Sequence, residues 1–489
     1  MFYSEPYNQI GQPFTMQLPS PPFTADVSVI GAGLAGTEAA LQLADRGYHV
    51  NLYDLKPHHR SPAHHSDKLA EIVCSNSFGS MGEAASGLLK REMAQLGCQL
   101  LAMATACAVP AGQALAVDRE QFSATVTERI QSHPNITFFA QEITELPTDT
   151  PYVLLATGPM TTEPLVKTMG QFLNRDNLYF FDAAAPIVMK ESINFDRAFF
   201  QDRYNKTLSD DGQASYINCP MNKEEYEAFY QFLTNAEKIP LKSFEEAQKA
   251  SFFESCMPVE VIASRGVDTL RYGPMKPVGL ENPHKPEEQP YAVVQLRQDN
   301  AEGTLYNLVG FQTNLKWGEQ KELLKLIPGL ETAEVVRYGV MHRNTYFHSP
   351  EVLTPTLQFQ QAPHLFLAGQ LTGTEGYTES IATGMVAALN IARLLAGEQP
   401  LPFPRETMIG SLLHYITREE AIGGNFQPIN SNWGILPELG FKVKVKKERA
   451  THHKTRALTA LSSFIPELTQ PLEPRVAVLP NNQLIDFFS

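Results

Sequence analysis

The first regular pattern in the chain is a short apolar stretch, followed by a helical repeat and a second apolar stretch. Residues 27–30 contain three β-branched apolar side chains, which predicts a buried parallel strand. From Thr37 to Arg46 apolar residues recur at helical spacing, and Gly47 stands where a left-handed residue would end the helix. Val50 to Tyr53 predict a second strand. The stretch therefore predicts a β-α-β unit with parallel strands.

The same alternation continues along the chain and returns in its last third. Further predicted helices cover 88–101, 118–130 and 379–395, and further predicted strands cover 135–139, 152–155 and 364–367. Strands that alternate with helices predict an α/β fold with a parallel sheet. We therefore expect a Rossmann-like domain of two lobes, each with its own strand and glycine-rich loop.

The middle of the chain has a different pattern. Lys223 to Asn235 predict a longer polar helix, and isolated strands such as Tyr291 to Leu296 replace the regular alternation. This change predicts an inserted α+β substrate domain. The expected parts are a flexible extension at 1–25, a first cofactor-binding part at 26–190, the insertion at 191–330, a second cofactor-binding part with a basic segment at 331–460, and a tail at 461–489.

Composition narrows the class of protein. The chain has 489 residues, 43% of them hydrophobic, which permits large cores. It lacks an apolar run long enough to span a membrane and a secretory signal, so a cytoplasmic location is expected. Five cysteines without C-x-x-C spacing argue against structural zinc and a disulfide framework. The net charge of −14 means that an RNA partner would need a local basic surface.

A glycine fingerprint follows the first predicted strand. Gly31, Gly33 and Gly36 have G-x-G-x-x-G spacing, and the second strand ends at Asp54. In such a turn the glycines allow close approach of a pyrophosphate, the helix N-terminus attracts it, and the acid accepts a hydrogen bond from ribose. The pattern predicts a dinucleotide site, whose expected first-lobe residues are Gly31, Ala32, Gly33, Leu34, Ala35, Gly36 and Asp54.

Two later stretches favour FAD over a nicotinamide nucleotide alone. The strand at 152–155 ends in Ala-Thr-Gly-Pro, which places Gly158 beside the expected cofactor. The strand at 364–367 is followed by a glycine-rich loop and a helix of small residues. That loop predicts a second cofactor-facing unit, with Gly369, Gln370 and Gly373 as its binding residues.

Several reactive or charged side chains lie in irregular stretches. Cys74 has small polar neighbours, so both a site wall and a packed core stay open for it, whereas Cys98 and Cys107 are expected in the core. The histidines between 58 and 65 lack the spacing of a metal site, and no metal is expected. A proline-stiffened loop carries three cations that suit an anionic ligand: Arg265, Arg271 and Lys276.

The tail contains a basic run between residues 442 and 456. Such runs are commonly solvated helix faces. In a chain with this net charge, the run is also the best candidate for a surface that follows nucleic-acid phosphates.

Taken together, several blocks resemble the folate- and FAD-dependent tRNA uracil-5-methyltransferases. The matching blocks are VIGAGLAGTEAA, PAHHSDKLAEIVCSNS, GLLKREM, VPAGQALAVDRE, LLATGP, FESCMPVEVIASRG, LRYGPMKPVGL, VRYGVMHRNT and LFLAGQLTGTEGYTESIATG. They cover about residues 27 to 395, and the blocks around Cys74 and Cys256 are the most specific. One departure is Phe78-Gly79, where the family pattern has Leu-Arg and therefore a cation.

The resemblance implies an enzyme that makes 5-methyluridine at position 54, in the T loop of tRNA. It implies 5,10-methylenetetrahydrofolate as the carbon donor, FAD as the carrier of that carbon, and NADH or NADPH as the reductant. Uracil C5 becomes nucleophilic only after a thiolate adds at C6. We hypothesise that Cys256 attacks C6 and that Cys74 accepts the C5 proton or shields the flavin; the reverse assignment stays open. His342 would stack on the folate ring.

Three other functions are each compatible with part of the sequence. A flavin oxidoreductase of a small metabolite would explain the glycine fingerprint but not the two cysteine blocks. A wobble-uridine tRNA-modifying relative that works with a GTPase would be expected to carry a long helical C-terminal domain. A non-catalytic FAD-holding RNA-binding protein would tolerate loss of both cysteines. The sequence gives no indication of the oligomeric state.

Overall fold

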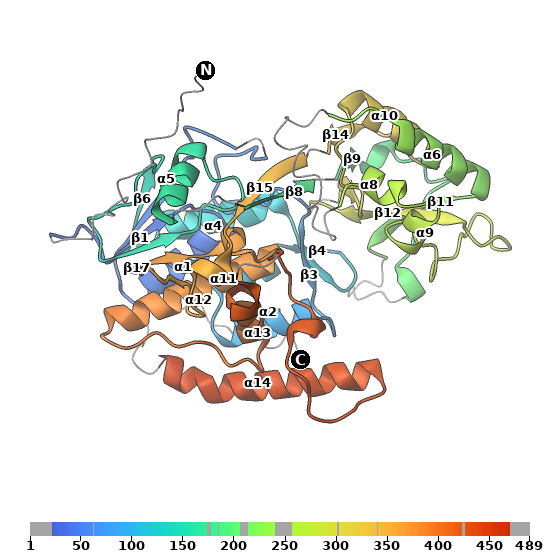
Figure 1. The fold of residues 1–489 in the computed structure, drawn as a ribbon. Coiled ribbons are helices and arrows are strands. Elements are labelled where there is room, and N and C mark those ends of the chain that lie inside the picture. Colours follow the sequence, from blue (N-terminus) through green and yellow to red (C-terminus); the bar gives the residue numbers. More distant parts are fainter. Residues whose placement is uncertain are drawn as a thin grey trace, which may run out of the picture.

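The computed structural model describes residues 22–61, 63–173, 178–183, 185–205, 214–239, 257–300, 303–339, 341–422 and 426–469, with side chains outside 178–183 and 341–344. Two bodies are apparent in Figure 1: a larger one that contains both ends of the described chain, and a smaller one built from its middle. Cys256 lies outside the described residues, and His342 is described only by its backbone.

The larger body is organised around a six-stranded sheet of order β16-β17-β7-β1-β2-β6. Its strands are β1 Val27–Ile30, β2 Val50–Asp54, β6 Ile136–Ala140, β7 Tyr152–Leu155, β16 Gln358–Phe359 and β17 Ala362–Leu367. Five run parallel and β16 is antiparallel at the edge. Strand β1, at the centre, is buried along its whole length and three of its four residues are apolar, which suits a strand with helices on both faces of its sheet.

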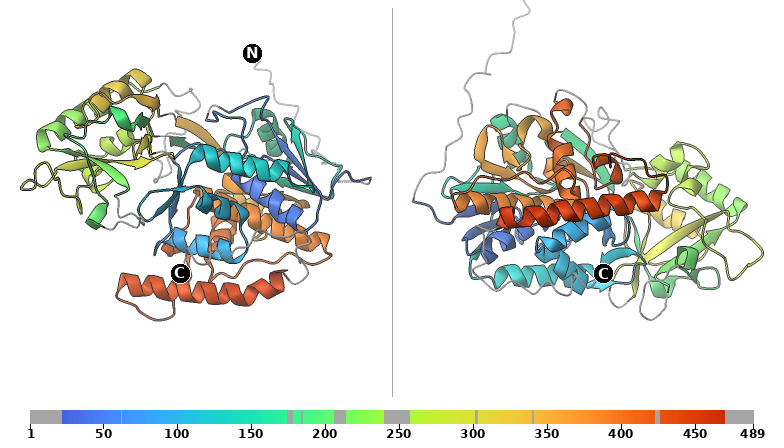
Figure 2. Two further views of the ribbon diagram at one scale, coloured as in Figure 1. Left: turned by 180° about the vertical axis from the view of Figure 1, so that it is seen from behind. Right: turned by 90° about the horizontal axis from the view of Figure 1, so that it is seen from below.

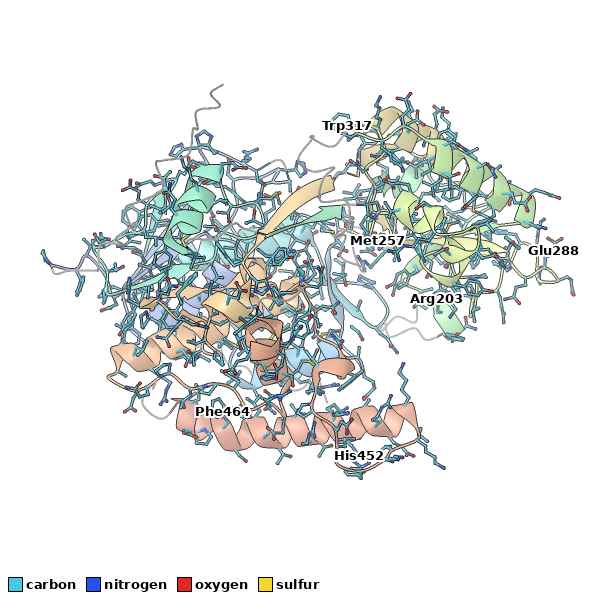
Figure 3. All side chains as sticks on the ribbon, in the orientation of Figure 1. Arg203, Met257, Glu288, Trp317, His452 and Phe464 are labelled. Atoms are coloured by element: carbon cyan, nitrogen blue, oxygen red, sulfur yellow. The ribbon has the colours of Figure 1, made fainter. Side chains whose placement is uncertain are left out.

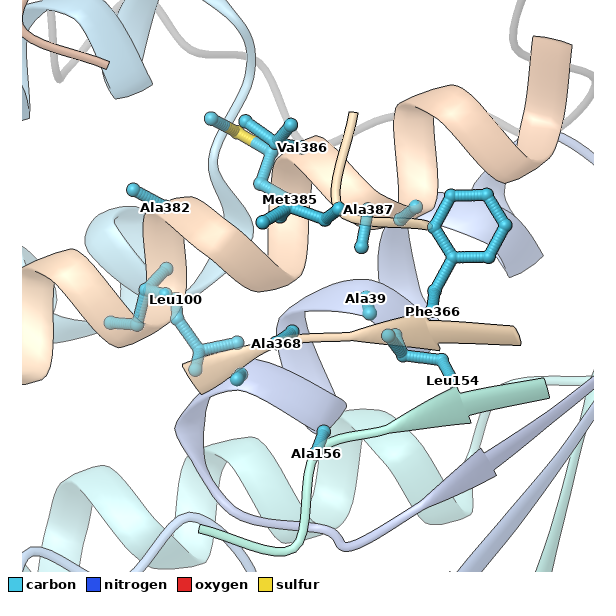
Figure 4. Close-up of a cluster of buried hydrophobic side chains, with 14 of the residues drawn as sticks. Ala39, Leu100, Leu154, Ala156, Phe366, Ala368, Ala382, Met385, Val386 and Ala387 are labelled. Carbon is cyan, nitrogen blue, oxygen red and sulfur yellow. The ribbon is translucent and has the colours of Figure 1, made fainter. Parts of the chain in front are cut away.

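Helices cover this sheet on both sides. They are α1 Leu34–Asp45, α3 Gln99–Ala106, α4 Arg119–Gln131, α5 Glu163–Leu173 and α12 Tyr377–Leu395. Small residues let α1 and α12 approach closely, because a Cβ at Gly384 would overlap the backbone of Ala35. Figure 4 shows the resulting core, in which Ala39 of α1, Met385 of α12 and Phe366 of β17 lie in one apolar layer.

One predicted helix proves to be two. The repeat at 88–101 is divided between α2 Ala85–Gln95 and α3, with Gly97 between them in the left-handed region at φ +80°. Glycine adopts that conformation without strain, so it ends α2 and lets the chain turn. A small antiparallel sheet of β3 Ser77–Ser80, β5 Ala114–Val117 and β4 Ala108–Val109 lies beside these helices.

The smaller body contains a six-stranded antiparallel sheet of order β10-β11-β12-β13-β9-β14. Its strands are β9 Ile187–Met189, β10 Phe199–Phe200, β11 Tyr216–Met221, β12 Ala292–Gln298, β13 Leu305–Leu308 and β14 Val335–Arg337. Its helices are α6 Lys223–Asn235, α8 Val259–Ser264, α9 Thr269–Tyr272 and α10 Trp317–Lys325. We call this body the inserted domain, and the larger body, which contains the predicted flavin-binding residues, the flavin domain.

A two-stranded antiparallel ribbon connects the two bodies. It pairs β8 Leu178–Ala183 with β15 Met341–Tyr346, so the chain leaves and re-enters the flavin domain through neighbouring strands. The predicted α/β class, with a parallel Rossmann-like sheet and an α+β insertion, is confirmed.

The C-terminal part packs on the flavin domain through α11 Ser349–Val352, α13 Met408–Thr417 and α14 Lys446–Thr469. Figure 2 shows α14 lying along one side of this domain. The Arg393 guanidinium on α12 donates to the carbonyl oxygens of Glu467 and Leu468 and holds the end of α14. The boundary predicted at residue 460 falls inside α14. None of the helices in the described ranges is both long and apolar enough to cross a bilayer.

A buried carboxylate begins α13. Both Glu92 oxygens accept hydrogen bonds from the backbone N–H groups of Met408 and Ile409, at 2.7 and 2.9 Å. The side chain is fully buried on α2, and burial raises the pKa of Glu92 to about 8. The folded protein therefore binds this proton more tightly than the unfolded chain does.

Glu92 should make stability depend on pH. Its contribution is fully present below the ordinary carboxyl pKa of 4.5 and is lost as the pH rises through about 8. We expect the melting temperature of the wild type to fall more between pH 6 and pH 9 than that of Glu92→Gln, which stays neutral. Glu224→Gln, at an exposed position on α6, is the control and should follow the wild type. Parallel curves for all three proteins would contradict this prediction.

Candidate active site

A pocket opens at the carboxyl edge of the parallel sheet. Its lining includes the turn after β1, the end of β2, the Thr157-Gly158 turn after β7 and the loop after β17. Of the predicted cofactor residues, those that line it are Gly31, Ala32, Gly33, Leu34, Ala35, Asp54, Gly158, Gly369 and Gln370. The pocket therefore joins residues that are more than 300 positions apart in the sequence.

The two remaining predicted glycines have packing roles. A Cβ at Gly36 would overlap the carbonyl oxygen of Gly31, so Gly36 permits α1 to start directly beside the turn. A Cβ at Gly373, where φ is +80°, would meet the ring of Phe426 at 2.5 Å. Gly33 is different, since a Cβ there would have no protein atom within 4 Å. It stands at the N-terminus of α1, on the pocket wall.

Asp54 fixes the shape of the glycine turn. One of its carboxylate oxygens accepts from the Ala32 backbone N–H at 2.7 Å, and the other accepts from the Lys56 N–H at 3.0 Å. The carboxylate thus ties the end of β2 to the turn after β1. Each oxygen still has accepting capacity, which a ribose hydroxyl could use.

The histidine-rich loop after β2 is held by an internal ion pair. Lys56 Nζ lies 3.2 Å from Glu71, whose other oxygen accepts from the backbone N–H of His65. His64 bonds Ser61 Oγ through Nδ1 at 2.6 Å, and burial lowers the pKa of His64 to about 4. His59 and His64 line the pocket, and the described residues contain no cluster of three metal-binding side chains.

Cys74 stands beside the pocket on a loop that is held from several sides. Its backbone N–H donates to the hydroxyl oxygen of Tyr377 at 2.7 Å, at the start of α12. Arg119 donates to the carbonyl oxygens of Ile72 and Cys74, both at 2.8 Å. Arg337 donates to the intervening carbonyl oxygen of Val73 at 2.6 Å. Two guanidinium groups therefore bind three successive carbonyl groups of this loop.

The same loop is the main polar contact with the inserted domain. Asp299, which follows β12, pairs with Arg119 at 2.9 Å. The buried Asn76 side chain accepts from Arg297 and Asn307, both at 3.2 Å, and donates to the carbonyl oxygens of Val117 and Gln298. The four residues that bond to the Asn76 amide are all buried. The two bodies therefore share a hydrogen-bonded interface behind Cys74.

Sequence reasoning did not single out Arg119, Arg337, Asp299 or Asn76. Arg119 and Arg337 lie in two blocks that carry the family resemblance, VPAGQALAVDRE and VRYGVMHRNT. Their presence in those blocks is the feature of the sequence that could have marked them as functional residues. Their roles depend on contacts with residues that lie 45 to 264 positions away, which no local pattern reveals.

The predicted substrate-binding residues differ in their exposure and in their partners. Arg265 and Lys276 are exposed. Arg271 is engaged in the protein, because it pairs with Asp268 at 2.7 Å and its guanidinium lies 3.5 Å from the centre of the Tyr291 ring. His342 pairs with Asp182 in the ribbon register.

The Phe78-Gly79 departure has a structural counterpart. Phe78 is buried and packs against Tyr377 with ring centroids 5.7 Å apart. A Cβ at Gly79 would lie 3.6 Å from Nζ of Lys90, a buried lysine of α2. A lysine amine therefore lies next to the position where the family pattern has an arginine.

Comparisons with known proteins agree with this geometry. The family described as Glucose inhibited division protein A matches residues 26–399. Two solved structures of Aquifex aeolicus GidA share the fold, with TM-scores of 0.65 and 0.66 at 18% and 17% identity, and this chain covers 76% of each.

Much higher identity is found with curated proteins called methylenetetrahydrofolate--tRNA-(uracil-5-)-methyltransferase TrmFO. Those of Bacillus licheniformis and Bacillus subtilis are each 55% identical over 90% of this chain and 98% of their own length. That of Enterococcus faecalis is 52% identical over 91% of this chain and 100% of its own. The chain therefore belongs to the TrmFO family of methyltransferases.

Proposed function

We propose that this chain is a tRNA-modifying methyltransferase that forms 5-methyluridine at position 54 of the T loop. The carbon donor is 5,10-methylenetetrahydrofolate, and FAD is the cofactor, reduced by NADH or NADPH in the cytoplasm. The observation that carries the proposal is the 52–55% identity with TrmFO proteins over nearly their whole length. By contrast, the similarity to GidA is 17–18% and supports the fold alone.

The pocket residues suit a flavin dinucleotide. The N-terminus of α1 offers unpaired backbone N–H groups and the positive end of the helix dipole, and Gly33 leaves open space in front of them. Asp54 is in reach of the same turn and would accept from the ribose. Gly369 and Gln370 would contact the other end of the cofactor. When bound, FAD would supply redox chemistry and transfer of the one-carbon unit.

Cys74 is placed to act next to that cofactor. Its loop is fixed by Arg119 and Arg337, and its own N–H is held by Tyr377, which lines the pocket proposed for FAD. We assign Cys74 as the group that accepts the C5 proton or shields the flavin. A fixed loop suits this role, because proton transfer needs the donor and acceptor within hydrogen-bonding distance.

We assign Cys256 as the thiol that adds to C6 of the uracil. The residues that follow it are firmly held: Val259 N–H donates to the Gln312 carbonyl oxygen at 2.7 Å, and Glu260 accepts from Thr313 and Asn314. Arg265 and Lys276 are proposed to meet phosphate groups of the RNA, while Arg271 holds their loop in shape. His342 is proposed to stack on the folate ring.

Substitutions at Gly33 and Gly36 distinguish an effect on cofactor binding from an effect on folding. We expect Gly33→Ala to fold with a normal melting temperature and to bind FAD at least tenfold more weakly, because its Cβ would enter only the space proposed for the pyrophosphate. Gly36→Ala should instead lose stability, since its Cβ would overlap the Gly31 carbonyl oxygen. Flavin absorbance after titration and thermal unfolding of the apoprotein would measure both effects. Equal FAD affinity of Gly33→Ala and the wild type would refute the proposed pyrophosphate position.

The activity itself can be tested by isotope transfer. Purified protein is supplied with methylene-labelled methylenetetrahydrofolate, NADPH and unmodified tRNA, and the tRNA is digested to nucleosides. We expect the label in 5-methyluridine from position 54, and no label when uridine 54 is replaced by cytidine. Absence of label from the wild-type tRNA, or label only in a wobble nucleoside, would overturn the proposed function.

The cysteine assignment can be tested with tRNA that contains 5-fluorouridine, because fluorine at C5 blocks proton loss and leaves the C6 adduct in place. The wild type and Cys74→Ser should form a covalent complex that survives denaturing electrophoresis, and Cys256→Ser should not. Cys107→Ser, a buried position, is the control and should form the complex. A complex with Cys256→Ser but not with Cys74→Ser would reverse the assignment.

A further inference from the structure

The basic run found in the sequence forms an exposed surface at the start of α14. Between residues 436 and 456 the chain has seven lysines and arginines and two acidic residues, although its net charge is −14. We use the term basic strip for residues 441–449, which form the loop before α14 and its first turn. This charge is therefore concentrated in one short segment.

The basic strip is available to a partner. Lys442, Lys444, Lys446 and Lys447 are exposed, and the described residues provide no ion pair for the first three. Apolar groups stand between these charges: Phe441 is 58% exposed and meets His452 edge-to-face at 5.2 Å, and Val445 is 52% exposed. Cations interleaved with an aromatic ring are the pattern of a surface that binds nucleic acid.

The segments on both sides of the strip are held in place by contacts. Arg456 donates to the carbonyl oxygens of Pro437 and Glu438 at 2.6 and 2.7 Å, which fixes the loop that leads into it. Lys454 pairs with Glu83 at 3.0 Å, in the loop that follows β3. Leu461 and Leu468, on α14 itself, are buried in the core of the flavin domain. A surface that is fixed before binding loses less entropy when it orders a ligand.

A short connection links the strip to the proposed flavin site. Ile429 exchanges backbone hydrogen bonds with the cofactor loop, donating to Gly373 and accepting from Glu375. Four residues later, Trp433 packs on His453 of α14 with ring centroids 6.0 Å apart. Four residues span at most roughly 14 Å. Lys446 lies seven residues before His453, about 10 Å along the helix, so the start of α14 is close enough to the site for one RNA arm to contact both.

The orientation of α14 agrees with such a path. In Figure 3, His452 marks the end of the helix toward the side on which the inserted domain lies, and Phe464 marks the opposite end. The strip thus lies at the end of α14 that points toward the side of the inserted domain.

We propose that the basic strip binds the phosphate backbone of the tRNA whose uridine is methylated, outside the T loop itself. This inference rests on the proposed function and adds the location of a backbone contact. The contact is electrostatic, so it holds any RNA helix of suitable shape and contributes affinity rather than base recognition.

The test compares two triple variants with the same loss of charge. Lys444, Lys446 and Lys447 are each changed to Gln in one protein, and the exposed Lys223, Lys285 and Lys325 of the inserted domain are changed to Gln in the other. Affinity for unmodified tRNA is measured between 0.05 and 0.2 M KCl, on the order of the range in which phosphate contacts dominate. Melting temperature and FAD content verify that each variant is folded.

We expect the strip variant to bind tRNA at least tenfold more weakly at low salt, and its logarithmic salt dependence to decrease by about 2. The control variant should stay within about twofold of the wild type. If the strip variant and the wild type bind tRNA with equal affinity and equal salt dependence, the inference is overturned. The proposed function still stands in that case, provided that the wild type transfers the isotope label to tRNA. If the wild type neither binds nor labels tRNA, both are wrong.

Discussion

The hydrogen bonds that Arg119, Arg337 and Asn76 make behind the Cys74 loop are the contact on which the rest of the structure depends. Burying a guanidinium or an amide is unfavourable unless its donors are satisfied, and here backbone carbonyl groups and Asp299 provide the partners. Because those partners come from both bodies, the contact that satisfies the buried charge also sets the position of the inserted domain. The Cys74 loop and the domain interface are thus one hydrogen-bonded unit.

Close backbone approach has the corresponding role within the flavin domain. Gly36 allows α1 to begin against the turn after β1, and Gly384 allows α12 to lie on α1. This packing brings the start of α12, with Tyr377, to the same pocket as the turn that contains Gly33. Small residues in the helices therefore bring two distant loops together around one pocket, and Asp54 holds the turn after β1 in shape.

The sequence was sufficient for the features that depend on local periodicity and turn chemistry. It predicted the parallel sheet, the glycine turn and the inserted α+β domain, and α6 was predicted at its observed bounds. It did not predict the break at Gly97, because apolar positions continue with nearly the same period on both sides. The hydrogen-bond partners of Arg119 and Asn76 could not be predicted from the sequence either, because they lie up to 231 positions away along the chain. Arg271 illustrates the same limit: its charge was evident, but its stacking on Tyr291 was not.

The ribbon of β8 and β15 has a consequence for the order in which the chain folds. Its two strands pair directly, yet roughly 160 residues separate Ala183 from Met341. Closing a flexible loop of that length costs on the order of 4–5 kcal/mol of entropy, which a short two-stranded pairing hardly offsets. Once the antiparallel sheet has formed, β9 and β14 are already neighbours and deliver the two ribbon strands to each other. The folding route with the lowest entropic cost of loop closure is therefore one in which the inserted domain assembles first. The two halves of the parallel sheet then join afterwards.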